Sequence, residues 1–396
     1  MKRLFLVFAL IAPLLTHAQT IKTDVLVIGN GDAAFAAGVQ ASESGVNTII
    51  LTQVDGLRLS EFKLIPKNSI TKAFEKQARK SLKLADSIRL PEITNQTANA
   101  IIKQWSDSSK LLKVINNSPY YELKRSGNDW ELKLTKEKTI KAKVLIVADD
   151  PKKLLAALKV TALTPAILKT LNYNDNLYRT SIAGEFYAKS SYLSLYNLLI
   201  PNQENLLYVS PVGFETGQAA GATAAYAAFY KTKTSLSNLK RIQGELLSYK
   251  LALISFEDIM NADSNWLAIQ KIAITGIIKA EIKDSKAYFN PEKPVTYKEI
   301  NQPIKDYYYK AQIWFDDHQN VPVNLENTIS MICYVGNKSI EATKIELQKK
   351  WNKNYRFSSK YDLKKLLSRR EFSVIINEYL KPFDNINVDK TGRVIR

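Results

Sequence analysis

The sequence predicts an α/β protein in which a parallel sheet with covering helices is followed by a mainly helical C-terminal part. Three observations predict this fold class. Apolar runs at residues 25–28, 48–51 and 143–148 have the composition of parallel strands that are covered on both faces. A glycine-containing turn and an alanine-rich helical stretch separate the first two runs, which gives a strand–helix–strand unit. From about residue 235 onward, aromatic and lysine-rich helical segments replace the small residues.

The N-terminus has the features of a secretory signal peptide. Lys2 and Arg3 form a basic start, residues 4–15 are apolar, and Thr16 and Ala18 place small residues at a cleavage site. The apolar run is too short to span a bilayer as a mature helix, although an uncleaved anchor remains the alternative. We therefore expect cleavage after about Ala18, a secreted or periplasmic protein, and no transmembrane segment after cleavage.

The turn after the first predicted strand has the spacing of a dinucleotide-binding motif. Gly29 allows the tight turn, Gly31 lets the backbone approach a pyrophosphate, and Ala34 keeps the helix close to the sheet. The helix starts at about Ala33, and the free N–H groups at its N-terminus favour phosphate. Because the motif follows a buried strand and opens a helix that returns to a second strand, it predicts a Rossmann-type unit.

Two positions depart from a normal dinucleotide site. Thr52 and Gln53 stand at the end of the second strand, where an Asp or Glu usually holds the adenosine ribose. A hydroxyl or amide bonds a ribose without the help of charge, so the bond is weaker. Asp32 lies inside the turn, where an inward carboxylate would repel phosphate. We expect that Asp32 instead caps the helix.

Further elements follow in order along the chain. Residues 66–118 look mostly helical and amphipathic, and 120–124 with 130–134 predict a hairpin around a turn-forming cluster. The other predicted elements are a helix over 151–173, a strand at 206–209 and a small-residue helix over 217–230. We place a domain boundary at the Lys/Thr/Ser stretch 232–238.

Four segments resemble FAD-dependent oxidoreductases of the glutathione-reductase-like class. Residues 23–34 resemble the start of that family, and 140–149 its strand that ends in Ala-Thr-Gly. Residues 198–209 are similar to the segment that enters its last flavin-site strand. Residues 215–221 resemble its closing helix, which contains Gly-Gln-Ala-Ala-Gly. The resemblance spans roughly residues 23–230.

This resemblance implies an FAD/NAD(P)-binding domain at 19–234, with a helical and hairpin insertion at about 57–138, followed by a mainly helical domain at 235–396. It also implies FAD as the cofactor, with contacts along the pyrophosphate, the ribose and the flavin ring. The implied cofactor-binding residues are Gly29, Gly31, Ala33, Ala34, Thr52, Gln53, Ala148, Gly217, Gln218 and Ala219.

Three departures from the family weigh against a working cofactor site. The ribose acid is absent, Ala-Thr-Gly is replaced by Ala148-Asp149-Asp150, and the glycine-rich stretch that packs on the flavin is reduced to residues 55–58. Because a flavin itself supplies the redox chemistry, few protein acids are needed, but the cofactor must still be held and covered. No catalytic acid, base or nucleophile can be named.

The C-terminal part weakly resembles S-layer homology modules over residues 268–300. A poorer second copy lies around 368–371, and both copies carry a [ST]-x-x-E pattern, at Thr296 and Ser368, which predicts a helix capping box. In that family the modules bind cell-wall polymer as a set, so a packing or docking domain is favoured here. Trp266, Trp314 and Trp351 are expected in the core rather than in a glycan-binding surface.

Composition excludes several classes of protein. The formal charge of +18, which falls to +16 when Lys2 and Arg3 leave, is spread along the chain. No nucleic-acid recognition motif accompanies it, so we expect no nucleic-acid partner. Cys333 is the only cysteine and His318 the only mature histidine, which excludes an intrachain disulfide and a multi-histidine metal site.

Two main hypotheses of function remain, beside a third, a polymer-binding wall protein, which rests only on the S-layer-like segment. The first is an exported FAD-dependent oxidoreductase-like protein of unknown small-molecule substrate, whose activity is retained, reduced or lost. The alternative is a cofactor-free binding or envelope-interaction module on a degenerate flavoprotein scaffold. It would contact an envelope polymer or protein through its basic surface and C-terminal domain. The intact glycine turn favours the first, and the missing ribose acid favours the second.

Overall fold

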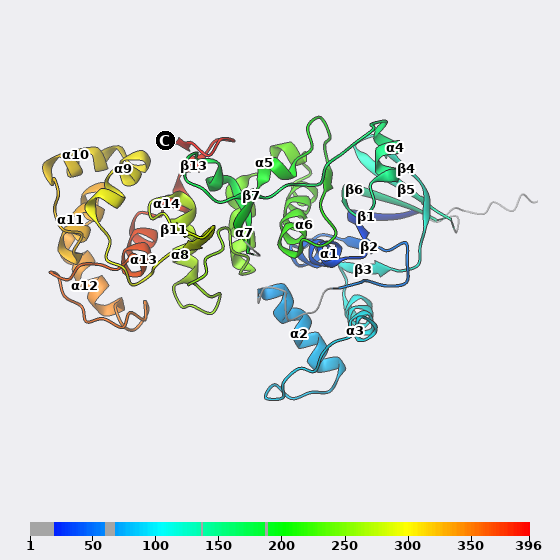
Figure 1. Ribbon diagram of the computed structural model, residues 1–396, viewed down its shortest axis with the longest axis horizontal. Helices are drawn as coiled ribbons and strands as arrows, with labels where there is room; N and C mark the ends of the chain where they lie inside the picture. The colour runs from blue at the N-terminus through cyan, green and yellow to red at the C-terminus, as the bar shows by residue number, and fades with distance from the viewer. Residues whose placement is uncertain (1–19, 60–67, 136–137, 187–188) are drawn as a thin grey trace, which may run out of the picture.

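The computed structural model describes residues 20–59, 68–135, 138–186 and 189–396, and the predicted signal peptide at 1–18 lies outside them. The molecule is elongated (Figure 1). One half contains the large sheet with its covering helices, and the other half is a helical assembly. Helices α2 (Ser69–Ser81) and α3 (Asn95–Ser108) project from the sheet half.

A seven-stranded sheet forms the centre of the first half. Its path runs β3-β2-β1-β6-β5-β4, and β10 pairs with β6 off this path. Strands β3, β2, β1, β6 and β10 are parallel, whereas β5 and β4 continue antiparallel. The bounds are β1 (Thr20–Gly29), β2 (Thr48–Leu51), β3 (Leu112–Ile115), β4 (Tyr120–Ser126), β5 (Asp129–Leu134), β6 (Thr139–Ala148) and β10 (Leu206–Tyr208). The predicted α/β fold with a Rossmann-like parallel core is confirmed.

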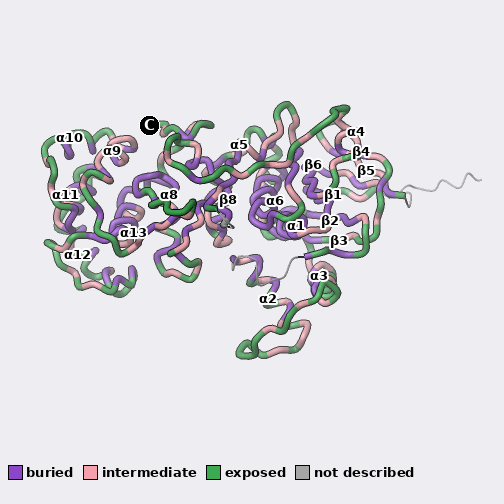
Figure 2. The backbone as a smooth tube through the Cα atoms, viewed as in Figure 1, coloured by how far each residue is buried: buried purple, intermediate pink, exposed green. Residues whose placement is uncertain are grey.

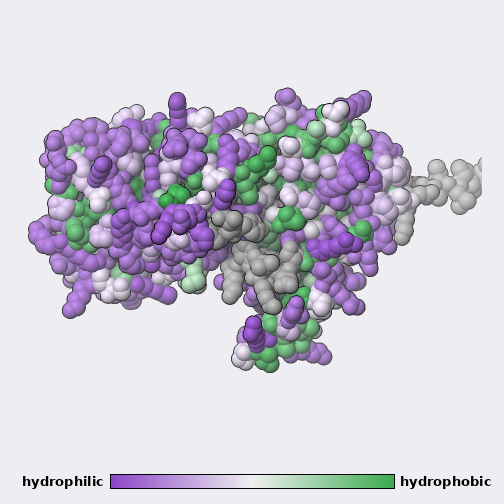
Figure 3. Space-filling view, in the orientation of Figure 1, coloured by the Kyte–Doolittle hydropathy of each residue, from purple (hydrophilic) through white to green (hydrophobic). Residues whose placement is uncertain are grey.

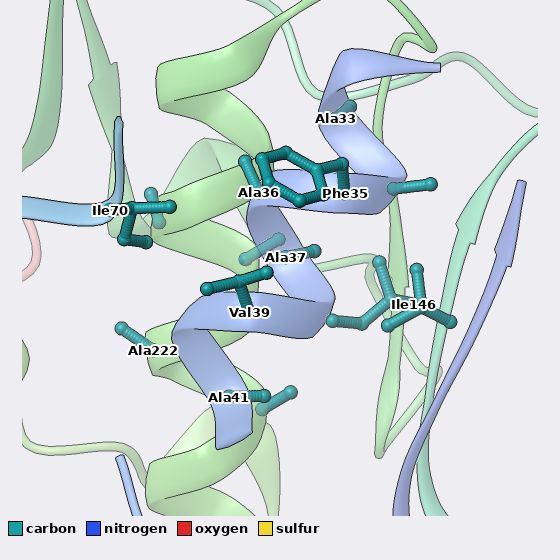
Figure 4. Packing of buried hydrophobic residues seen from close by; sticks show 14 of the residues in the cluster. Ala33, Phe35, Ala36, Ala37, Val39, Ala41, Ile70, Ile146 and Ala222 are labelled. Carbon is teal, nitrogen blue, oxygen red and sulfur yellow. The ribbon is translucent and has the colours of Figure 1, made fainter. Parts of the chain in front are cut away.

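Two small-residue helices cover one face of this sheet. Helix α1 (Asp32–Glu43) and helix α6 (Phe214–Phe229) pack together at close range, because Gly217 lies against the backbone of Ala33 and Gly221 against that of Ala37. Figure 4 shows side chains of α1 between the sheet residue Ile146 and neighbouring helices. The other face packs against helix α4 (Lys152–Leu158) and the β4–β5 hairpin.

A small sheet and two helices lie between the two halves. The sheet has the order β7-β9-β8, with β7 (Lys169–Thr170), β8 (Ser181–Phe186) and β9 (Ser190–Ser194). The short α5 (Leu195–Leu198) follows β9, and α7 (Leu239–Ser248) continues the chain after α6. Both lie between the halves in Figure 1.

The second half is mainly helical around its own apolar core, which is buried as Figure 2 shows. Trp266, Trp314 and Trp351 all lie in this core, as the sequence predicted. The helices are α8 (Trp266–Thr275), α9 (Tyr297–Tyr307), α10 (Tyr309–Asp317), α11 (Leu325–Gly336), α12 (Ile340–Lys350), α13 (Arg369–Tyr379) and α14 (Pro382–Asn385). The strands are β11 (Glu281–Lys283), β12 (Lys286–Tyr288), β13 (Asn387–Val388) and β14 (Val394–Ile395).

Several local predictions differ from the structure. The helix expected over 151–173 is only α4, because Lys159 adopts a left-handed conformation (φ 55°) that ends it. Strand β3 lies within the stretch that was expected to be mostly helical. Asp32 is the first helical residue rather than the cap, since Gly31 holds the N-cap position. Thr296 makes no side-chain cap, whereas the capping box at Ser368 is formed.

Candidate functional site

The candidate site lies at the carboxyl edge of the parallel strands, where α1 and α6 begin. The carboxyl ends of β1 and β6 are adjacent, with Gly29 opposite Ala148. Helix α1 begins directly after the glycine turn, and five residues separate the end of β10 from the start of α6. In an open α/β sheet this edge is where ligands bind, so each predicted site residue can be tested here against its actual neighbours.

Both turn glycines are required by packing of the chain itself. Gly29 has a φ of +152°, which side chains rarely allow, and a Cβ there would collide with the carbonyl of Ala148. A Cβ on Gly31 would collide with the carbonyl oxygen of Pro211. The space that Gly31 leaves free is therefore filled by the segment between β10 and α6.

The N-terminus of α1 is capped by the same segment. The backbone N–H of Ala33 donates a hydrogen bond to the carbonyl of Pro211 at 3.1 Å. On the other side of the turn, the N–H of Arg58 donates to the carbonyl of Asn30 at 2.6 Å. One of the N–H groups that would receive a pyrophosphate is thus already satisfied by the protein.

The N-terminus of α6 is also capped from within the chain. The carboxylate of Glu185, at the end of β8, accepts hydrogen bonds from the hydroxyl of Thr216 and from its backbone N–H. A carboxylate at this position complements the partial positive charge of the helix end. In the FAD-dependent family, the resemblance assigns this helix end to the flavin ring.

Three carboxyl groups gather beside the two helix ends. Glu185, Glu215 and Asp32 are all buried, with exposed fractions of 3%, 7% and 5%. The pKa of Glu215 is raised to about 8, chiefly by burial and in part by the charges of Glu185 and Asp32. Burial likewise raises the pKa of Glu185. Any of these carboxyl groups repels a diphosphate when it is ionised, which for Glu215 requires a pH above about 8.

The residues expected at the ribose are hydrogen-bonded to other residues of the chain. Thr52 is fully buried, and its hydroxyl donates to the carbonyl of Val54 at 2.6 Å. Gln53 donates to Asp149 at 3.2 Å and accepts from Lys153 at 2.9 Å. These groups therefore tie the end of β2 to the segment that follows β6.

The residues expected at the flavin ring lie inside the α1–α6 packing. Gly217 contacts Ala33, and Gln218 and Ala219 have no exposed surface. The amide of Gln218 donates to Gln40 at 2.8 Å and accepts from Asn68 at 2.7 Å. Buried amides need such partners, so this pairing explains Gln218 without a ligand.

The described residues at these positions do not fit FAD in the way that the family resemblance implies. The pyrophosphate position is filled by Pro211, the α6 N-terminus carries Glu185, the polar groups at the ribose position are paired, and the three flavin-edge residues lie in a helix interface. Sequence reasoning missed Pro211, Glu185 and Gln40. No local sequence pattern indicates the roles of these three residues, because each forms a hydrogen bond with a residue that is distant in the chain.

Other chemistry has little support in the part of the chain that the structure describes. No group of three or more acidic, histidine or cysteine side chains there is arranged to hold a metal ion. Cys333 is buried, and His318 stacks on Trp314 with ring centroids 4.4 Å apart. Among the described helices, none has both the length and the apolar character that a membrane span requires.

Comparisons with known proteins return structural likeness alone. No family model and no curated protein matches the chain, so the resemblance to S-layer homology modules gains no support.

Among solved structures, the bacillithiol disulfide reductase Bdr of Staphylococcus aureus is 15% identical, with 33% of this chain and 38% of that chain covered and a TM-score of 0.21. Thioredoxin reductase of T. acidophilum is 16% identical, with 32% of this chain and 34% of that chain covered and a TM-score of 0.21. The rebeccamycin biosynthetic enzyme RebC with reduced flavin is 16% identical, with 38% of this chain and 37% of that chain covered and a TM-score of 0.25. The chain thus covers less than half the length of each structure, and TM-scores this low say nothing of its activity.

Proposed function

We propose that this chain is an exported, cofactor-free binding module built on a flavoprotein-type scaffold. The observation that carries the proposal is the capping of α1 by Pro211 and of α6 by Glu185. Helix N-termini attract anionic ligands because their N–H groups lack partners. Where the chain supplies such partners itself, the attraction for the FAD phosphates and the reduced flavin is weakened.

Absorbance and thermal unfolding of the purified mature chain test the proposal. We expect no flavin absorbance between about 350 and 500 nm, and no change in melting temperature when FAD is added in excess, since a ligand stabilises only what it binds. A yellow protein, or one that FAD stabilises, would overturn the proposal.

Two glycine substitutions extend this experiment to the turn itself. Gly31→Ala should lower stability by roughly 1–3 kcal/mol without any cofactor, because its methyl group meets the Pro211 carbonyl. Gly244→Ala is the matched control. A Cβ at that position of α7 meets no atom within 4 Å, so alanine should be neutral or stabilising. Equal stability of Gly31→Ala and the wild type would show that Pro211 does not fill this space.

A basic groove supports a binding role. It has a volume of about 750 Å³ and lies between the β4–β5 turn and the end of α6. Its cationic residues are Arg125, Lys143, Lys231 and Lys233, which outnumber its acidic residues Asp129 and Glu204. Lys231 and Lys233 are exposed and form no salt bridge with any described residue. On the face drawn in Figure 3 hydrophilic residues predominate. These features favour an anionic polymer of the cell envelope as partner.

One observation favours the second candidate function, an FAD-dependent oxidoreductase. The strand–turn–helix geometry at Gly29 is intact, and α6 begins beside α1 as a closing helix would. The same absorbance spectrum separates the two candidates, because an oxidoreductase of this kind needs its flavin bound. The filled position beside Gly31 makes the cofactor-free module the better supported of the two.

A further inference from the structure

A separate hollow lies at the opposite end of the α1–α6 pair from the glycine turn. Its volume is about 340 Å³, within the range of small-molecule pockets. The C-terminal ends of α1 and α6 and the face of α7 enclose it. It is lined by Ser44, Ala222, Ala225, Tyr226, Phe229, Tyr230, Arg241, Ile242 and Glu245. Neither hypothesis of function uses these residues.

The rim of this hollow carries aromatic rings that packing does not require. Phe229 is 62% exposed and Tyr230 is 49% exposed. The ring of Tyr230 lies 4.6 Å from that of Tyr226 and 5.1 Å from that of Phe229. The floor is made of small or aliphatic buried residues, among them Ala222 and Ile242. A contiguous exposed aromatic surface of this kind marks a contact with another molecule.

A hydrogen-bond donor and a hydrogen-bond acceptor, both charged, lie beside the aromatic rings. Arg241 donates to the hydroxyl of Tyr230 at 3.0 Å and forms no salt bridge among the described residues. Glu245, one turn further along α7, accepts from the hydroxyl of Ser44 at 2.8 Å. The hollow therefore offers a guanidinium donor, a carboxylate acceptor and tyrosine hydroxyls around an apolar floor.

A hydrogen-bond chain through the core fixes the polar wall. Ser44 accepts from Gln40 at 3.0 Å, Gln40 accepts from Gln218, and Gln218 accepts from Asn68, which caps α2. Because Gln40, Gln218 and Asn68 have no exposed surface, their geometry is held by packing. Glu245 is thus positioned before any ligand arrives, which lowers the entropic cost of binding.

We infer that this hollow binds a hydroxyl-rich ring, namely a sugar unit of an oligosaccharide. Tyrosine rings offer apolar faces to the C–H groups of a sugar and hydroxyls to its edge. Arg241 and Glu245 match hydroxyl groups, which both donate and accept hydrogen bonds. An apolar ligand would exclude water from these two charged groups without offering them any hydrogen bond beyond those to Tyr230 and Ser44, which is unfavourable. The inference does not rest on the loss of FAD, because the hollow is at the other end of the helices.

Calorimetric titration of the purified mature chain tests the inference, with maltotriose, cellotriose, chitotriose and trigalacturonate as probes. We expect at least one trisaccharide to bind at millimolar concentration or below. Tyr230→Ala should weaken that binding about tenfold or more, and Glu245→Gln should weaken it several-fold with the rings intact. Tyr121→Ala removes a tyrosine that is 63% exposed on β4, and it should leave binding unchanged.

Three results would overturn the inference. The first is that none of the four trisaccharides binds at millimolar concentration, and the second is that Tyr230→Ala and Glu245→Gln both bind as the wild type does. The third is a concentration-dependent dimer that Tyr230→Ala dissociates, because the aromatic rim would then be a contact between copies of the chain. Since FAD is absent from every titration, failure here leaves the absorbance experiment on the glycine turn unaffected.

Discussion

Single residues at the carboxyl edge of the sheet show how a ligand site becomes part of the protein's own packing. Glu185 caps α6, the Pro211 carbonyl accepts from Ala33, and Gln218 pairs with two buried amides. Each of these groups forms a hydrogen bond that a bound dinucleotide would otherwise have to form. The local chemistry is therefore complete without a cofactor.

Glu215 should make stability depend on pH near neutrality. Its pKa is raised from 4.5 to about 8 in the folded protein, mainly by burial. Between these two values the folded chain holds a proton that the unfolded chain has released, so stability falls as pH rises toward 8. Glu215→Gln imitates the protonated acid, and it should match the wild type near pH 5 and exceed its stability near pH 8.5. The gain is at most a few kcal/mol, since one pKa unit is about 1.4 kcal/mol.

Urea unfolding of both proteins at the two pH values measures this difference. Glu92→Gln serves as the control, because Glu92 is exposed and its substitution should shift neither curve. If Glu215→Gln lowered stability equally at both pH values, the carboxylate would be ionised in the folded protein and bonded to a cation.

At the scale of elements, the two [ST]-x-x-E segments are joined to each other rather than independent. Pro294 pairs with Ser368 in an antiparallel bridge, and the N–H of Val295 donates to the carbonyl of Leu367. Arg369 is buried beside Glu299, with 2.7 Å between its guanidinium and the carboxylate. A buried guanidinium needs a carboxylate partner, and Glu299 supplies it while its carboxylate also accepts from the backbone N–H of Thr296.

This difference predicts unequal effects of two similar substitutions. Ser368→Ala removes a formed cap and should lower the free energy of unfolding by about 1 kcal/mol. Thr296→Ala removes a side chain without a cap bond and should change it by less than about 0.5 kcal/mol. Chemical denaturation of the two variants measures both changes. Equal losses would mean that Thr296 caps α9 in solution.

The sequence predicted those elements whose signals are local. The apolar runs and the glycine turn depend on neighbouring residues, and the structure contains them. Strand β3 was not predicted, because it has only four residues and pairs only with β2. So short a strand shows little alternation of apolar and polar residues. The caps by Glu185 and Pro211 could not be predicted, since each joins segments that only the folded chain brings together.

At the scale of the whole molecule, the two cores meet along α7 and the small sheet. Leu246 packs in the core of the sheet half, whereas its neighbour Leu247 packs in the helical core. The amide of Gln243 donates to the carbonyls of Arg179 and Ser181, and Arg179 donates to that of Thr275. Near the C-terminus, Val388 packs back into the core of the sheet half.

These contacts predict that the two halves unfold together. A chain cut at the predicted boundary after residue 234 would lose α7, which supplies Leu239, Ile242 and Leu246 to the core of the sheet half. We expect residues 19–234 alone to give poorly dispersed NMR spectra, and the mature chain to show one calorimetric transition with equal calorimetric and van't Hoff enthalpies. Two resolved transitions, together with a well-folded 19–234 fragment, would instead make the boundary a division between independent domains. The contacts of Gln243 and Arg179 would then be a surface between docked units rather than part of a shared interior.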